Sequence, residues 1–134
     1  MRQTEVEQIF EQVLSYQNSD HLQLSLTGTE LANTRFANNT ITQNTVQKDS
    51  GLSVIASFGQ KVGQASTNRL QADGLKEVVS RAEKIAQSAA EDSEYLPPVS
   101  TQTYAKVSAY DHQTAMTSPQ ARAEKVQLAI QQCE

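Results

Sequence analysis

Apolar side chains recur at every second position through much of the span from residue 21 to residue 67, which predicts a β-sheet. Residues 21–27 alternate without interruption and place Leu22, Leu24 and Leu26 on one face. The residues typical of turns in this span are Gly28, Asn38-Asn39, Asp49-Ser50-Gly51 and Gly59-Gln60-Lys61. We therefore expect about five short strands, and the short connections favour antiparallel neighbours because parallel crossovers need a dozen residues or more.

Two positions in this span leave the strand geometry open. Between Thr40 and Lys48, the apolar residues Ile41 and Val46 fall on opposite faces, so either one is exposed to solvent or a β-bulge shifts the register between them. In the last short strand, Gly63 predicts either a close approach of another backbone or a bulge.

Helical periodicity lies on both sides of the sheet region. Thr4 and Glu7 fit a capping box, so we expect the first helix to begin at Thr4. Asp73 is the expected cap of the second and strongest helix, and Ser118-Pro119 begins the last one. Three apolar stripes follow, at Val6, Ile9, Phe10, Val13 and Leu14, at Leu75, Val78, Val79, Ala82, Ile85, Ala86 and Ala89, and at Val126, Ala129, Ile130 and Cys133. Because such stripes must be buried, we expect the first two helices to cover one face of the sheet.

These elements predict an α+β fold, with about five mostly antiparallel strands in one sheet, amphipathic helices on one face and a trailing helix. We divide the chain into an α+β core at 1–95, a Pro-containing connector at 96–117 and the trailing helix at 118–134. The apolar stripe of that helix reaches Cys133 without a terminating signal, so we expect either a chain that ends here or a piece of a longer protein.

Charge and composition narrow the class of protein. The formal net charge of -4 and the pI near 5.2 argue against nucleic-acid binding, which needs a concentrated excess of Lys and Arg. No apolar run reaches the roughly 20 residues of a membrane span. Residues 1–12 are too polar and acidic for a secretory signal. We expect a cytoplasmic protein without nucleic-acid or membrane partners.

The sequence offers no catalytic, cofactor-binding or metal-binding set. His21 and His112 have no partner at ligand spacing, so both are expected to be surface or strand-end residues. Cys133 lies on an apolar stripe and is expected to be a small buried hydrophobe instead of a nucleophile. The glycines at 59 and 63 lack the spacing of a phosphate-binding loop, and flanking strands favour a hairpin turn.

Two sets of polar residues are candidates for contacts with a peptide or a partner. The first gathers near strand ends and consists of Arg35, Asn38, Asn39, Asn44 and Asn68. Its side chains could bind a peptide backbone, although plain turn chemistry is favoured for such asparagines. The second set is expected on the sheet face away from the helices and consists of Gln23, Ser25, Thr27, Ser53, Ile55 and Ser57. We expect this face, or an open sheet edge, to meet another domain, a partner subunit or an extended peptide by strand addition.

A family resemblance extends from Arg35 to Ala86. Its elements are Arg35-Phe36-Ala37-Asn38-Asn39, the strand end Gly63-Gln64-Ala65-Ser66-Thr67-Asn68, and the helix with Ala82 and Ala86. In this order and spacing they resemble the amino-terminal domain of the TldD/PmbA family. Members were named as modulators of DNA gyrase and are regarded as metallopeptidases or their paired subunits.

The resemblance implies an α+β domain that precedes a larger, mostly β carboxy-terminal domain. In the catalytic branch the later domain carries a zinc-binding HExxxH-type helix, which the PmbA-like branch lacks. No zinc ligand or catalytic residue is therefore carried over to a position of this chain, and the branch stays open. Any zinc would belong to the carboxy-terminal domain.

The function implied by the resemblance is that of a non-catalytic amino-terminal domain, which contributes to a peptide-substrate channel and to subunit contacts. The implied partners are the carboxy-terminal domain, a second subunit in a homo- or hetero-oligomer, and unfolded peptide. The alternative is a free-standing protein- or peptide-binding module with no enzymatic role. Direct binding of DNA or gyrase, suggested by the family's older name, is weakened by the acidic charge.

Overall fold

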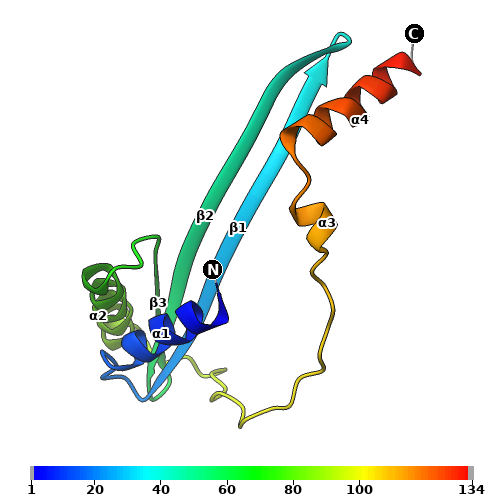
Figure 1. The fold of residues 1–134 in the computed structure, drawn as a ribbon. Coiled ribbons are helices and arrows are strands. Elements are labelled where there is room, and N and C mark those ends of the chain that lie inside the picture. The colour runs from blue at the N-terminus through cyan, green and yellow to red at the C-terminus, as the bar shows by residue number, and fades with distance from the viewer. Residues whose placement is uncertain (1, 133–134) are drawn as a thin grey trace. The chain divides into compact units, whose positions relative to one another are not determined.

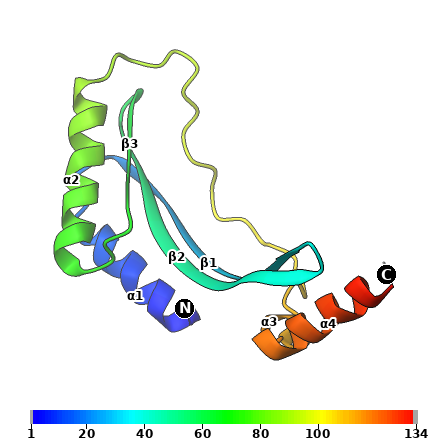
Figure 2. The ribbon, with the colours of Figure 1, turned by 90° about the horizontal axis from the view of Figure 1, so that it is seen from above.

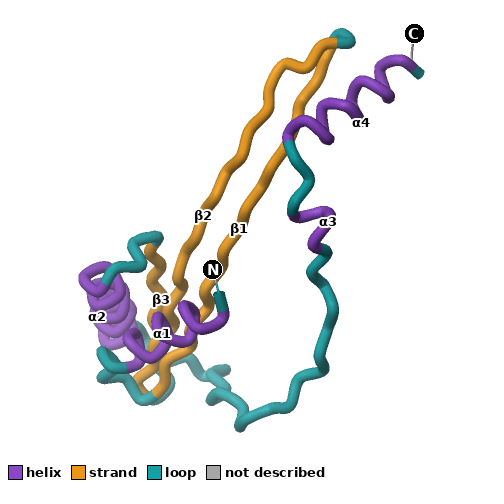
Figure 3. The backbone as a smooth tube through the Cα atoms, in the orientation of Figure 1, coloured by secondary structure: helices purple, strands orange, loops and turns teal. Residues whose placement is uncertain are grey.

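The computed structural model describes residues 2–132, which form helices and one antiparallel sheet (Figures 1 and 3). The elements, in chain order, are α1 (Gln3–Leu14), β1 (His21–Ala37), β2 (Thr40–Phe58), β3 (Lys61–Thr67), α2 (Ala72–Ser88), α3 (His112–Ala115) and α4 (Pro119–Gln131). The strand order is β1-β2-β3. This confirms the combination of helices with an antiparallel sheet. The expected number of strands is wrong, because the described residues form three strands instead of five.

The difference arises at two turns that do not exist. Gly28 lies inside β1 and residues 49–51 lie inside β2, so each pair of expected strands is one continuous strand. Gly28 does not adopt the positive φ that a tight reversal would use. A continuous ladder of two long strands satisfies the backbone groups of both, and this outweighs the weak turn preference of Gly, Asp and Ser.

The two remaining reversals follow their local sequences. Asn38 and Asn39 have φ values of 50° and 55°, the pair of positive angles that a type I′ hairpin turn requires. Gly59 has a φ of 56° at the first central position between β2 and β3, the position at which a type II′ turn needs glycine. Ile41 and Val46 are 40% and 56% exposed, so the structure leaves both of these apolar residues in contact with solvent.

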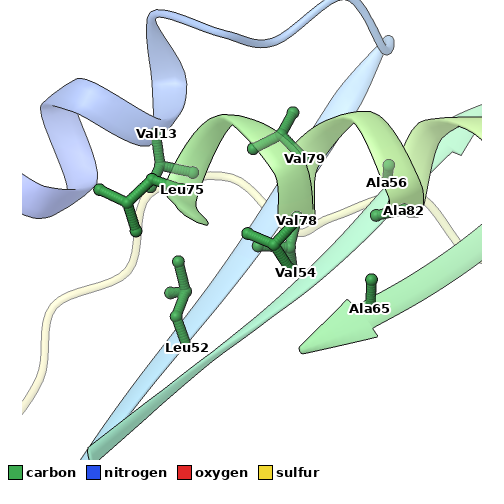
Figure 4. Packing of buried hydrophobic residues seen from close by; sticks show 9 residues of the cluster. All are labelled: Val13, Leu52, Val54, Ala56, Ala65, Leu75, Val78, Val79 and Ala82. Atoms are coloured by element: carbon green, nitrogen blue, oxygen red, sulfur yellow. The ribbon is translucent and has the colours of Figure 1, made fainter. Parts of the chain in front are cut away.

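The hydrophobic core lies where α2 packs on the sheet (Figure 4). It comprises Val13, Leu52, Val54, Ala56, Ala65, Leu75, Val78, Val79 and Ala82. The three leucines of β1 are partly buried against this cluster, as their alternation predicts. Each large side chain buried here contributes roughly 1.5 to 3 kcal/mol relative to exposure. The stripe of α2 is thus confirmed as the face that covers the sheet, although Ile85 remains half-exposed.

Gly63 marks the closest approach between α2 and β3. A Cβ atom at this position would overlap the backbone of Ala82 and Ala86, coming within 2.9 Å of the Ala86 Cα. Only a residue without a side chain therefore lets the helix lie this close to the strand. Of the two sequence-based alternatives for Gly63, the structure confirms the close backbone approach.

The predicted starts of the first two helices are displaced by a residue or more. α1 begins at Gln3, and the Glu5 carboxylate, instead of that of Glu7, accepts the Arg2 backbone N–H at 2.8 Å. α2 begins at Ala72 after Gln71, whose carbonyl accepts the Leu75 N–H at 2.9 Å. The carboxylate of Asp73 does not cap this helix, because it pairs with Arg69.

Contacts divide the chain into two compact units. Unit 1 comprises Met1–Gly28 and Asp49–Ser100, and unit 2 comprises Thr29–Lys48 and Thr101–Glu134. In unit 2, the Ser118 hydroxyl accepts the Ala121 N–H at 3.1 Å and Pro119 opens α4, which confirms the predicted start of that helix. Cys133 lies outside the described residues. No helix in the described part of the chain combines the length and apolar character needed to cross a membrane.

Candidate functional site

Unit 1 exposes the outer edge of its sheet at β3. The sheet order makes β3 an edge strand, and Phe58 pairs with Lys61 across the two-residue turn. Hydrogen-bonded and non-bonded pairs alternate along an antiparallel ladder, and the pair that closes such a turn is bonded. Val62, Gln64 and Ser66 belong to the intervening pairs, so their N–H and C=O groups point away from β2.

One of these outward groups already has a partner. The Arg81 guanidinium on α2 donates a hydrogen bond to the Ser66 carbonyl at 2.5 Å. At the other end of β3, the Asp92 N–H donates to the Gln60 carbonyl at 2.9 Å. The stretch between these two contacts, centred on Val62 and Gln64, is the open edge of β3.

The sheet face opposite α2 is polar and built of small side chains. The Gln64 amide donates to the Ser53 hydroxyl at 3.0 Å across β2 and β3. The Tyr95 and Ser57 hydroxyls lie 3.0 Å apart, so the segment after α2 covers one end of this face. On β1, the alternation places Gln23, Ser25 and Thr27 opposite the leucines that pack on the core, and all three are exposed.

The predicted contact residues divide between the two units. Asn38 and Asn39 form the hairpin turn, which agrees with the turn role favoured from the sequence. Arg35 lies next to this turn on β1 and has an exposed side chain, while its carbonyl accepts the Thr42 hydroxyl at 3.3 Å. Asn68 follows β3 in unit 1 and is exposed.

Asn44 belongs to a polar cluster in unit 2 that the sequence did not indicate. Its side-chain oxygen accepts the Thr34 hydroxyl at 3.2 Å and the Arg122 guanidinium at 3.0 Å. Arg122 also donates to the Thr34 hydroxyl at 3.2 Å and to the Thr117 carbonyl at 2.8 Å. This arginine therefore holds the start of α4 against the hairpin, and Asn44 acts in that contact.

Unit 1 contains a buried carboxylate that was also missed. Glu83 on α2 is 6% exposed, and its Oε1 accepts the backbone N–H groups of Asn18 at 2.6 Å and Ser19 at 2.9 Å. Its Oε2 accepts the Asn18 side-chain amide at 3.2 Å. The donors precede β1 and lie more than sixty residues away along the chain, so no local pattern marks this pair. Glu83 fixes the loop between α1 and β1.

Neither histidine lies in a metal-binding arrangement. His21 opens β1, and His112 opens α3 with its ring centroid 6.4 Å from that of Tyr110. Within residues 2–132, no three His, Cys, Asp or Glu side chains are grouped as ligands for a metal ion.

Asp111, just before α3, has a pKa below its usual value. The main cause is a hydrogen bond from the Thr114 hydroxyl, and the second is the Thr114 backbone N–H, which donates to the Asp111 carboxylate at 2.6 Å.

Comparison with known proteins gives a family model and similar solved structures. A family model described as PmbA/TldA metallopeptidase domain 1 matches residues 23–86. The solved structure of TldE from Thermococcus kodakarensis has a TM-score of 0.80 at 15% sequence identity, over 94% of this chain and 28% of that chain. At this identity the likeness shows a shared fold, and this chain spans 28% of the length of that relative. No curated protein matches the sequence.

Proposed function

Because this chain belongs to the TldD/PmbA family as its amino-terminal domain, we propose that it is a non-catalytic part of a metallopeptidase or of its paired subunit. In this proposal it contributes to the peptide-substrate channel and to contacts between subunits. None of the described residues forms a metal-binding group, so no zinc ligand and no hydrolytic step is assigned to them. Zinc belongs, in the proposal, to the domain that follows.

The open edge of β3 is the observation that carries the role in peptide contact. An edge strand with outward N–H and C=O groups can pair with any extended chain, because the hydrogen bonds are made by the backbone alone. Val62 and Gln64 supply such groups on a strand that α2 and the core hold in place. This suits a channel wall that accepts unfolded peptides of varied sequence.

The polar sheet face supports contacts with a further domain or subunit. Ser53, Gln64 and Ser66 are small or flexible polar residues that can be covered by another protein surface without leaving large apolar groups behind. The same face carries the half-buried Ile55 as its central apolar residue. A mainly polar surface with one central apolar residue is typical of an interface with another domain or subunit, whereas a domain's own core is mainly apolar.

The role in peptide contact can be tested by nuclear magnetic resonance on the 134-residue chain. Titration with an unfolded peptide of mixed sequence should shift the backbone amide signals of residues 61–67 and leave those of α1 in place. A peptide with the same composition and N-methylated backbone amides is the control, since it lacks the donors needed for strand pairing. Unchanged β3 signals at millimolar peptide would contradict a role for this edge.

A further inference from the structure

The side of α2 that faces the open edge of β3 carries a cationic side chain, Arg81, and an apolar side chain, Ile85, four residues apart. Arg81 reaches the Ser66 carbonyl, and Ala82 and Ala86 lie over Gly63, so this part of α2 runs along β3. Figures 1 and 2 both show α2 next to β3. Ile85 lies one helical turn beyond Arg81 on the same side, and it is 44% exposed although it belongs to the apolar stripe of α2.

The opposite side of α2 is turned toward another part of unit 1. There Glu83 receives the backbone of Asn18 and Ser19, ahead of β1. Successive residues of a helix are about 100° apart, so Glu83 and Arg81 are roughly 200° apart around the axis. Arg81 is therefore assigned to the β3 side by its contact with Ser66, and Ile85 is assigned to the same side by helical geometry.

Arg81 keeps its charge available in this position. Its guanidinium has five donors, and the hydrogen bond to Ser66 uses one of them. In the described part of the chain, Arg81 makes no ion pair with a carboxylate, whereas Arg69 at the start of α2 pairs with Asp73 and Glu77. A carboxylate brought to the end of the β3 edge would therefore meet an uncompensated cation.

The spacing of the two side chains matches an extended peptide. Residues four apart on a helix have Cβ atoms about 5 to 6 Å apart. Side chains two apart on a strand are about 6.6 Å apart and point to the same face. A strand added to β3 could thus place one side chain at Arg81 and the next on that face at Ile85.

We propose that the open edge of β3 selects extended peptides that carry an acidic and an apolar residue two positions apart, with the acid at Arg81 and the apolar side chain on Ile85. This inference rests on the proposed function, since it assigns a preference to the same edge. Because Arg81 occupies the Ser66 carbonyl, the backbone of the peptide pairs at Gln64 and Val62.

The test compares three fluorescent unfolded peptides that differ only at their centre: Asp-Ser-Leu, Asn-Ser-Leu, and Ser-Asp-Leu, in which acid and Leu point to opposite faces. The 134-residue chain should bind the Asp-Ser-Leu peptide tightest. Replacing Arg81 by Glu should weaken this binding about fivefold or more, because an attraction becomes a repulsion. It should leave binding of the Asn-Ser-Leu peptide within about twofold. Ile85→Ser should weaken the binding of the Asp-Ser-Leu and Asn-Ser-Leu peptides, since it removes the apolar contact for their Leu side chain.

Lys76→Glu is the matched control, because it makes the same charge change on an exposed position of α2 away from this side. Circular dichroism and the urea midpoint establish that each variant is folded, and Ile85→Ser tests the inference independently if Arg81→Glu does not fold. Equal binding of the three peptides, with β3 amide shifts retained, would overturn the selectivity and leave the proposed function standing. Absence of β3 shifts with every peptide would overturn both.

Discussion

Replacing Glu83 by Ala should destabilise the protein more than any other single change at a charged residue of α2. The side chain is 6% exposed and its Oε1 accepts two backbone N–H groups, at 2.6 and 2.9 Å. Alanine removes this shared acceptor and leaves the Asn18 and Ser19 N–H groups without it. Each unsatisfied buried group costs about 1 to 3 kcal/mol.

The expected loss is therefore about 2 to 5 kcal/mol in the free energy of unfolding. The lower part of this range is expected, because Ser19 is buried whereas Asn18 is exposed, so that water can replace the lost acceptor at Asn18. Glu83→Gln keeps an acceptor oxygen for the same N–H groups and loses only the charge, so it should cost about 1 kcal/mol. Lys84→Ala, at the neighbouring exposed position, should change stability by less than about 0.5 kcal/mol.

Urea unfolding followed by circular dichroism measures these differences from the midpoints at constant slope. In the Ala variant, the rate of amide hydrogen exchange should increase most at Asn18 and Ser19, relative to the unsubstituted protein. The reasoning would be refuted if Glu83→Ala unfolded at the same urea concentration as Lys84→Ala, or if Glu83→Gln cost as much as Glu83→Ala.

Three further predictions test the packing and the polar contacts. Gly63→Ala should cost about 1 to 3 kcal/mol, because its Cβ overlaps the backbone of α2, whereas Gly28→Ala, with open space around it, should be neutral or stabilising in thermal unfolding. Arg122→Ala should speed amide exchange in α4 through loss of three hydrogen bonds, and Arg122→Gln should restore part of the protection; equal exchange in all three proteins would contradict this. The Asp111 carboxyl should titrate below 3.8 by carbon-13 shift because Thr114 donates to its ionised form, so its stabilising effect is present at neutral pH and is lost as the pH falls through that depressed pKa. Thr114→Ala should return the pKa toward 3.8, and an unchanged value would rule out the hydroxyl as the main cause.

Features that depend on neighbours in sequence were predicted well. The alternation at Leu22, Leu24 and Leu26, the stripe of α2 and the Ser118-Pro119 start all follow from the geometry of a single strand or helix. The close approach at Gly63 was one of two alternatives, since a missing side chain signals that something lies near without saying what. Turn chemistry at Asn38-Asn39 was likewise local.

Features that depend on pairing between distant segments were predicted poorly. Gly28 and residues 49–51 are typical of turns, yet they lie inside long strands because each strand pairs with the other. The sequence does not predict the roles of Arg122 and Glu83, because their partners Thr34 and Asn18 are 88 and 65 residues away along the chain. Neither residue belongs to a motif, and their roles exist only after the chain has folded.

The sequence by itself determined which segments are helical or extended, which faces are apolar, and the resemblance to a known family, because these depend on residue type and spacing. Only the tertiary structure decided the number of strands and which backbone groups of β3 point away from β2. It alone also decided that the side of α2 with Arg81 lies next to that edge. The physical reason is that hydrogen-bond pairing and packing are made between residues far apart in the chain, and no local pattern encodes which distant group will arrive.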